Sequence, residues 1–325
     1  MIPIRDASRS KTFPAVNVLL IALNVLAFLW QLSQGQRLEE AFFLYGIVPA
    51  RYSDPSIAAH FTAFQQVLPF FTTMFLHGGF LHILGNMWFL YIFGDNIEDR
   101  LGHLRYLIFY LLCGVVAGLV HLVTNWNSKV PTIGASGAIS GVMGAYLVLY
   151  PRARILTLIP IFFFFQFVEI PAYIFLAFWF LMQLLSAGMA SGGAEVGGVA
   201  FWAHVGGFIT GLLFVKVFDW IPRMGLDNRL KPYTERQTTP RLQTVSPQAL
   251  GDELDVYGTL AVSRREALQG ARKMISVPEG LRRRSVMVTI PPGVEDGTRL
   301  RLKGLGRKDP EGNRGDLYLG VRIAG

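Results

Sequence analysis

The chain has 325 residues, of which 52% are hydrophobic and only 16% are charged, and its mean hydropathy is +0.39. Soluble domains average about 25% charged residues, so this composition excludes a soluble protein over most of the length. The formal net charge is +8, and the only cysteine, Cys113, lies in an apolar run, which excludes an internal disulfide and a cysteine-based zinc site.

Six apolar runs, each near the ~20 residues that a helix needs to cross a membrane, predict six transmembrane helices. They occupy residues 14–34, 69–93, 104–124, 131–150, 170–187 and 197–218. The first is too long for the core of a signal peptide, and no small-residue cleavage site follows it before Gln36, so we expect it to stay as a helix. A seventh stretch, residues 155–167, is too short to cross and contains Pro160, which predicts an interfacial or re-entrant segment.

After Asp219 the sequence becomes charged and rich in proline and glycine. We therefore expect a membrane domain over residues 1–221, a linker over 222–251 and a small all-β domain over 252–325. Apolar and polar residues alternate in "SVMVTI", "TRLRLKG" and "DLYLGVRI", "PPGVEDG" supplies a turn, and the one helical signal is "SRREALQG". The basic run from Arg282 to Arg284 lacks a recognition helix or an aromatic platform, so we interpret it as a solvated turn and expect no nucleic-acid partner.

Basic residues beside the apolar runs predict the orientation of the chain. One side would carry Arg5, Arg9, Lys11, Arg100, Arg105, Arg152, Arg154, Arg223, Arg229 and Lys231. The opposite loops carry only Arg37, Arg51 and Lys129. We therefore expect a multi-pass protein of a bacterial cytoplasmic membrane with both termini in the cytoplasm. The charge also attracts anionic lipid, but we favour topology alone as its role.

Strongly polar side chains inside apolar runs are costly and mark candidate sites. His82 and Asn86 lie four residues apart in the second run and therefore share a helical face. Ser136 lies in the fourth run and His204 in the sixth. Under the predicted topology these three runs pass from outside to inside, and the polar groups lie at a similar depth in the outer half of the bilayer. We expect the three helices to bring them together.

Such a set of side chains can support acyl transfer. His204 can accept the proton of Ser136 and so make the hydroxyl nucleophilic. No Asp or Glu in these runs is placed as a third member, so the sequence predicts a dyad. The backbone N–H of Ser136 in the first turn of its helix, with the side chains of Asn86 and His82, can stabilise the oxyanion.

Each of these features also has a structural interpretation. A small-residue face for helix packing would be formed by Gly134, Gly137, Gly141 and Gly144. A histidine or asparagine inside a membrane is commonly an interhelical hydrogen-bond partner, and we interpret His77 and His121 as interfacial. A metal site built from His82 and His204 would lack a carboxylate and an H-E-x-x-H motif, so we expect no metal.

Four motifs together resemble the rhomboid intramembrane serine proteases over about residues 12–220. "HGGFLHILGNMWFL" is similar to the family's H-x-x-x-N helix, "FGDNIEDRLG" to its E-x-R-x-G turn, "GASG" to its nucleophile motif and "AHVGGFITG" to its A-H-x-x-G-x-x-x-G helix. The structural positions of these motifs are Glu98, Arg100, Gly102, Gly134, Gly137, Gly207 and Gly211. The resemblance implies a six-helix core in which Ser136 is the nucleophile, His204 is the base, and His82, Asn86 and the Ser136 amide stabilise the oxyanion.

The resemblance further implies that the protein cleaves transmembrane segments of other membrane proteins near the outer membrane surface, without a cofactor or metal. Two features depart from the family. Ser140 stands four residues after the nucleophile, where some members have a tyrosine that packs against the catalytic histidine, so the support of His204 stays open. The stretch 155–170 is also longer than in minimal members.

The C-terminal part resembles the client-binding β domain of DnaJ-type co-chaperones, on "LAVSRREALQGARKMISVPEG", "VTIPPGVEDGTRLRLKGLG" and "GDLYLGVRI". It lacks the His-Pro-Asp signature and the CxxCxGxG repeats, so stimulation of a chaperone ATPase is not implied. Two hypotheses follow. The first is an intramembrane serine endopeptidase whose cytoplasmic domain binds peptide clients or regulates the core. The second is a non-catalytic rhomboid-like adaptor or chaperone that binds transmembrane spans and unfolded clients.

Overall fold

The computed structural model describes residues 1–6, 10–161, 164–190, 200–221, 234, 242–245, 247–249, 254–279, 282–309 and 312–324. The chain divides into two compact units, residues 1–235 and 236–325. Most of the predicted linker at 222–251, including Arg223, Arg229 and Lys231, lies outside the described residues, as does Arg9.

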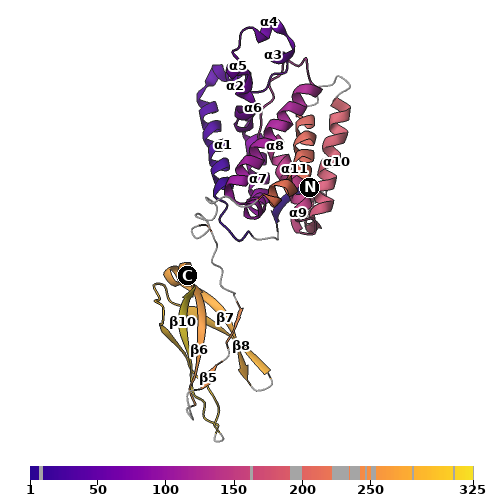
Figure 1. The fold of residues 1–325 in the computed structure, drawn as a ribbon. Coiled ribbons are helices and arrows are strands. Elements are labelled where there is room, and N and C mark those ends of the chain that lie inside the picture. Colours follow the sequence, from indigo (N-terminus) through magenta and orange to yellow (C-terminus); the bar gives the residue numbers. More distant parts are fainter. Residues whose placement is uncertain are drawn as a thin grey trace. The chain divides into compact units, whose positions relative to one another are not determined.

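The first unit is built mainly from helices (Figure 1). Its long helices are α1 (Ala15–Ser33), α7 (Phe80–Leu101), α8 (His103–Thr124), α9 (Ser136–Leu149), α10 (Ala172–Ala190) and α11 (Phe201–Trp220). Short helices join α1 to α7, namely η1 (Gly35–Arg37), α2 (Leu38–Tyr45), α3 (Ala50–Ser53), α4 (Pro55–Ala58), α5 (Ala63–Val67), α6 (Pro69–Thr72) and η2 (Thr73–Phe75). Its strands are β1 (Ile2–Asp6), β2 (Arg154–Ile161) and β3 (Phe164–Pro171).

The predicted α-helical membrane part is confirmed, with two differences in its helices. Among the described residues, α1, α8, α10 and α11 are long and apolar enough to cross a membrane, and α5 to η2 together with α7 makes a fifth candidate that is bent by 79°. The predicted second run is therefore broken, at "LHGG" before Phe80, where two glycines disfavour a continuous helix. Helix α9 has only 14 residues, because Gly134 adopts a φ of +134° and the helix starts after it. Six crossings therefore stay a prediction.

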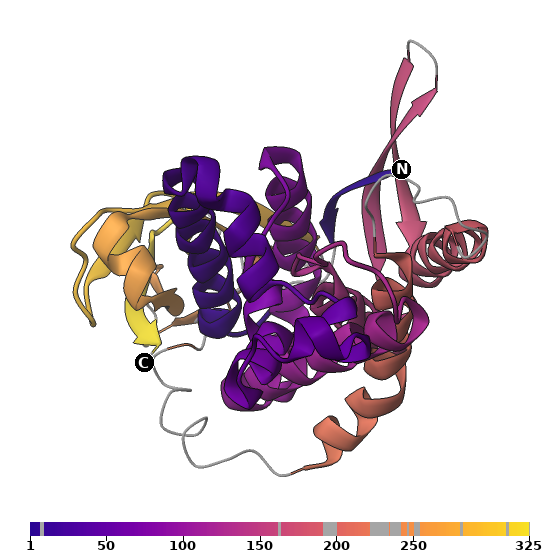
Figure 2. The same ribbon diagram turned by 90° about the horizontal axis from the view of Figure 1, so that it is seen from above.

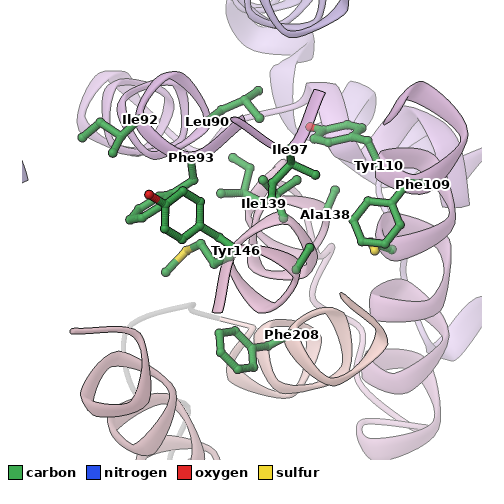
Figure 3. Close-up of a cluster of buried hydrophobic side chains, with 14 of the residues drawn as sticks. Leu90, Ile92, Phe93, Ile97, Phe109, Tyr110, Ala138, Ile139, Tyr146 and Phe208 are labelled. Atoms are coloured by element: carbon green, nitrogen blue, oxygen red, sulfur yellow. The ribbon is translucent and has the colours of Figure 1, made fainter. Parts of the chain in front are cut away.

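Helix α9 lies in the centre of the first unit and contacts α7, α8, α10 and α11. Figure 3 shows Ala138, Ile139 and Tyr146 of α9 among side chains of the neighbouring helices, such as Phe93 and Phe208. The rings of Phe93 and Tyr146 meet edge to face with centroids 5.1 Å apart, a favoured aromatic geometry. The helix that begins with Ser136 is therefore fixed by packing on several sides.

Glycines allow α9 and α11 to approach at backbone contact. A methyl group on Gly207 would lie 2.0 Å from the carbonyl oxygen of Gly137, and one on Gly211 would lie 1.9 Å from that of Gly141. Small residues at these positions are what permits close helix crossing in membranes. The predicted packing face is thus present at Gly137, Gly141 and Gly144, whereas Gly134 lies before α9 and faces His82. The face joins the helices that carry Ser136 and His204.

The described residues of the apolar stretch at 155–167 form no seventh helix and lie in the two strands of a β-hairpin, and an interfacial or re-entrant position in the membrane stays a prediction. Strands β2 and β3 pair antiparallel, and β1 pairs with the other edge of β2. Figure 2 shows the hairpin extending past the helices with β1 beside it. Pro160 is tolerated in β2 because β1 pairs only with Ile155–Leu158, so the proline lies beyond this partner.

In its described residues the second unit contains two β-sheets and one short helix, and its strands agree with the alternating sequence. One sheet has the order β5-β6-β10-β9 and the other β4-β7-β8. The elements are β4 (Leu242–Thr244), β5 (Gln248–Ala249), β6 (Val256–Ser263), α13 (Arg264–Gln269), β7 (Ala271–Glu279), β8 (Arg282–Ile290), β9 (Arg299–Leu302) and β10 (Leu317–Ala324). Both sheets contribute to one core, for example through Leu260, Ile275 and Leu319, which are fully buried. Ser263 and Glu266 form a capping box that starts α13.

Candidate active site

Ser136 is the first residue of α9 and follows a constrained turn. The backbone N–H of Gly134 donates to the carbonyl of Thr73 at 2.9 Å, which ties the turn to the segment before α7. A side chain on Gly134 would lie 2.9 Å from Nε2 of His82, so glycine is required by space as well as by its positive φ. The serine side chain is thereby held at a helix N-terminus, where first-turn N–H groups have no intrahelical partner.

His204 lies in the first turn of α11 and contacts Ser136 directly. Its Nε2 is 2.7 Å from Oγ of Ser136, and its Nδ1 is 2.8 Å from Oε1 of Gln183. The residue is 9% exposed, and its ring lies beside those of Trp179 and Phe201. With the Gln183 carbonyl oxygen accepting from Nδ1–H, the assigned tautomer leaves a lone pair on Nε2 that faces the serine hydroxyl. This is the arrangement in which histidine can accept the serine proton.

Two donors face the same region from the start of α7. Nδ1 of His82 accepts a hydrogen bond from the backbone N–H of Gly78 at 3.2 Å, so in the neutral ring the proton is on Nε2. That Nε2 lies on the side of Gly134 and Ser136. Asn86 is 8% exposed, and its Nδ2 has no hydrogen-bond partner in the described part of the chain. A buried amide without a partner is costly, and its N–H can donate to an acceptor that enters the site.

These groups line one cleft of about 910 Å³. Helices α7, α9, α10 and α11 contribute residues to the cleft. Many of its other lining residues are apolar. Phe80 and Leu81 are 68% and 81% exposed. The cleft therefore combines a serine-histidine pair, free donors and an apolar wall, which suits an apolar polypeptide segment as substrate.

The structure brings together only one part of the predicted set. His82, Asn86, Ser136 and His204 line the cleft, with Gly134 beside them. Gly102 has a φ of +87° and ends α7, so the E-x-R-x-G motif forms the last turn and cap of that helix. This motif lies 16 or more residues along α7 from His82, about 24 Å at 1.5 Å per residue. It cannot act on the same reacting atoms.

Glu98 and Arg100 instead join α7 to α1 and α11, at the end of α7 that lies away from His82. The carboxylate of Glu98 accepts the backbone N–H groups of Val16 at 2.9 Å and Asn17 at 2.7 Å and contacts Nδ1 of His103. It therefore caps the first turn of α1 from another helix. Arg100 pairs with Asp219 of α11 at 2.8 Å.

Replacing Glu98 with glutamine is expected to destabilise the first unit by about 2–4 kcal/mol. The amide NH₂ would face a backbone N–H at a position where the carboxylate oxygen now accepts. Thermal unfolding of the purified protein in detergent measures this loss of stability. The exposed Glu169 offers a matched Glu169→Gln control, which should change stability by less than about 0.5 kcal/mol. Equal stability of the two variants would contradict the capping role.

Sequence reasoning missed Gln183 and Trp179, both on α10. The available signal was a glutamine inside an apolar run, four residues after a tryptophan. His77 and His121, which we interpreted as interfacial, are buried in the protein, at 1% and 8% exposure, and their depth in the membrane stays a prediction. His121 contacts the Thr132 hydroxyl at 2.6 Å. Among the residues described, no group of three His, Cys, Asp or Glu side chains is arranged to hold a metal ion.

Comparison with known proteins agrees with the two units. Residues 65–219 match the family model of the Rhomboid domain, and residues 256–325 match that of the DnaJ C terminal domain. The chain is 31% identical over 165 residues to RHOMBOID-like protein 1 of Arabidopsis thaliana, covering 51% of this chain and 38% of the relative. It is 29% identical over 203 residues to Rhomboid protein 1, mitochondrial, of Saccharomyces cerevisiae, covering 60% and 51%.

A third relative is the human presenilin-associated rhomboid-like protein, mitochondrial, at 29% identity over 203 residues, covering 60% of this chain and 46% of the relative. The chain thus spans about half or less of the length of these relatives. Two of the three are named as mitochondrial.

Proposed function

We propose that this chain, a membrane protein that carries a Rhomboid domain and a DnaJ C-terminal domain, is a serine endopeptidase that cleaves transmembrane segments of other proteins. One observation carries the proposal, the 2.7 Å contact between Nε2 of His204 and Oγ of Ser136 in a cleft that also contains Nδ2 of Asn86, which has no partner among the described residues. A serine whose only role was close helix packing would need neither a histidine acceptor nor an amide donor beside it.

The chemistry follows from these atoms. Ser136 Oγ attacks the scissile carbonyl carbon while its proton moves to Nε2 of His204. The carbonyl oxygen becomes an oxyanion that accepts hydrogen bonds from the Ser136 N–H, Asn86 Nδ2 and His82 Nε2. His204 then gives its proton to the leaving amine, which leaves an acyl-serine. A water molecule hydrolyses the ester by the same route, with His204 as the base, and restores the hydroxyl.

The roles of the other parts belong to the same proposal. The substrate is a transmembrane segment, since the cleft wall is apolar, and cleavage occurs near the outer membrane surface. Both termini lie in the cytoplasm of a bacterial cell. The β unit binds peptide or unfolded clients or regulates the core, as its match to the DnaJ C terminal domain suggests.

Labelling of Ser136 by a serine-reactive fluorophosphonate tests the proposal, together with cleavage of a model single-span substrate by the full chain. We expect labelling in the wild type and in the exposed-serine variant Ser33→Ala. Binding of substrate without labelling or cleavage would instead identify a non-catalytic adaptor.

Replacing Asn86 with leucine is expected to lower kcat by about 10²–10³, because an oxyanion donor acts in the transition state. KM should change by less than about threefold, since the neutral carbonyl of the bound substrate gains less from this donor than the oxyanion of the transition state does. Steady-state cleavage kinetics measure both, with Asn127→Leu at an exposed site as the matched control. A wild-type kcat in the Asn86 variant would remove this side chain from the oxyanion site.

A further inference from the structure

Gln183 is a polar side chain in the apolar helix α10, and it contacts the proposed base on the side away from the nucleophile. Its Oε1 lies 2.8 Å from Nδ1 of His204, whose Nε2 lies 2.7 Å from Oγ of Ser136. We infer that Gln183 is a positioning residue that makes the third member of a Ser136–His204–Gln183 triad. The inference rests on the proposed function of the cleft.

The physical basis is the tautomer of the imidazole. A neutral histidine carries one ring proton, and only the form protonated on Nδ1 leaves Nε2 free to accept from serine. The carbonyl oxygen of Gln183 selects that form by accepting from Nδ1–H. When Nε2 takes up the serine proton, the same oxygen stabilises the resulting imidazolium through its dipole. A neutral amide can do this inside a membrane without the desolvation penalty of a buried carboxylate.

The orientation of the His204 ring also depends on side chains of α10. Trp179 lies one helical turn before Gln183, so both side chains lie on one face of α10. The Trp179 ring is 5.9 Å from that of His204, at an interplanar angle of 36°. Ser140 instead donates to the Ser136 carbonyl at 2.6 Å. The support that a tyrosine at position 140 would have given therefore comes from another helix.

Interhelical packing alone is the alternative role for this hydrogen bond. Glutamine often forms hydrogen bonds between transmembrane helices. Helix α10 is much less buried in the protein than α11, so such a bond could help to hold it in place. A bond that only joined the helices would affect how α10 is held, and its loss would leave kcat unchanged. The two roles are therefore separated by kcat, while the tautomer tests the hydrogen bond itself.

The first test compares Gln183→Met with Gln183→Glu in the full-length protein. Methionine preserves length without an acceptor, and we expect kcat for a single-span substrate to fall about 10- to 100-fold, with KM within about twofold of wild type. Glutamate keeps an acceptor oxygen at the same reach, and we expect it to keep kcat within about fivefold. Leu184→Met, the next residue on α10 and 41% exposed, is the matched control and should behave as wild type.

The second test reads the proton directly. Nitrogen chemical shifts of His204 in the wild-type protein should show the Nδ1-protonated tautomer, and the Gln183→Met variant should show loss of that preference. An Nε2-protonated ring in the wild type would overturn the inference even if the variants misfold. A wild-type kcat in Gln183→Met, with Ser136→Ala inactive, would overturn it and leave the proposed function intact. Cleavage by Ser136→Ala would instead defeat the proposed function itself.

Discussion

Replacement of Ser136 with alanine is expected to lower the rate of substrate cleavage by roughly 10⁴-fold or more, because no covalent acyl-enzyme can form without the hydroxyl. The substitution removes one oxygen atom at the start of α9 and leaves the glycine contacts of that helix in place. The variant should therefore keep the thermal stability of the wild type to within a few degrees. Loss of activity with retained stability would show that the substitution acts on the chemical step and not on folding.

The measurement is cleavage of a single-span substrate in reconstituted vesicles, with fluorophosphonate labelling as a second readout. His204→Ala should show a similar loss, since the two residues act as one unit and their effects are not additive. Ser33→Ala, at an exposed position at the end of α1, is the matched serine control. Cleavage by purified Ser136→Ala at more than a few per cent of the wild-type rate would exclude Ser136 as the nucleophile.

Substitution of Gly211 with alanine is expected to destabilise the first unit by about 3 kcal/mol or more and to abolish activity. The added methyl group would lie 1.9 Å from the carbonyl oxygen of Gly141, which is backbone and cannot rotate away. Helices α9 and α11 would have to separate. The Ser136–His204 contact bridges these two helices, so the nucleophile and the base would move apart together with the packing.

Gly188 of α10 provides the matched control, because no atom of the described residues lies within 4 Å of a methyl group added there. Alanine is the better helix former by about 1 kcal/mol, so Gly188→Ala should leave stability unchanged or raise it. Thermal unfolding and the rate of fluorophosphonate labelling measure both variants. A Gly211→Ala protein as stable and as reactive as the control would show that the close helix crossing is dispensable.

Much of the site was predictable because its residues belong to types that are costly inside a membrane. His82, Asn86, Ser136 and His204 stood out as polar groups in apolar runs, and their spacing from the run ends placed them at one depth. The glycine spacing of α9 and α11 likewise predicted a close crossing. Alternation of apolar and polar residues predicted strands β8, β9 and β10 of the second unit, whose apolar residues pack in one core.

Other features depend on contacts between segments that are distant in sequence. The stretch 155–167 is apolar except for Thr157 and Gln166, and a short apolar run has no periodicity that separates a strand from a helix. Its pairing with residues 2–6 settles the matter in favour of a hairpin. Glu98 looked like part of a local turn, but besides the nearby His103 it binds backbone groups more than 80 residues away.

Composition, periodicity and the cost of burying polar groups are local properties, and they were enough to predict the membrane character, the division into two units and the four polar residues of the cleft. The starts of α7 and α9, and the identity of the side chain that faces Nδ1 of His204, depend instead on contacts between distant segments. That last choice depends on how α10 crosses α11, which brings Gln183 to within 2.8 Å of a residue 21 positions away. A lone glutamine in an apolar run indicates some polar contact, but the helix crossing decides with which atom it is made.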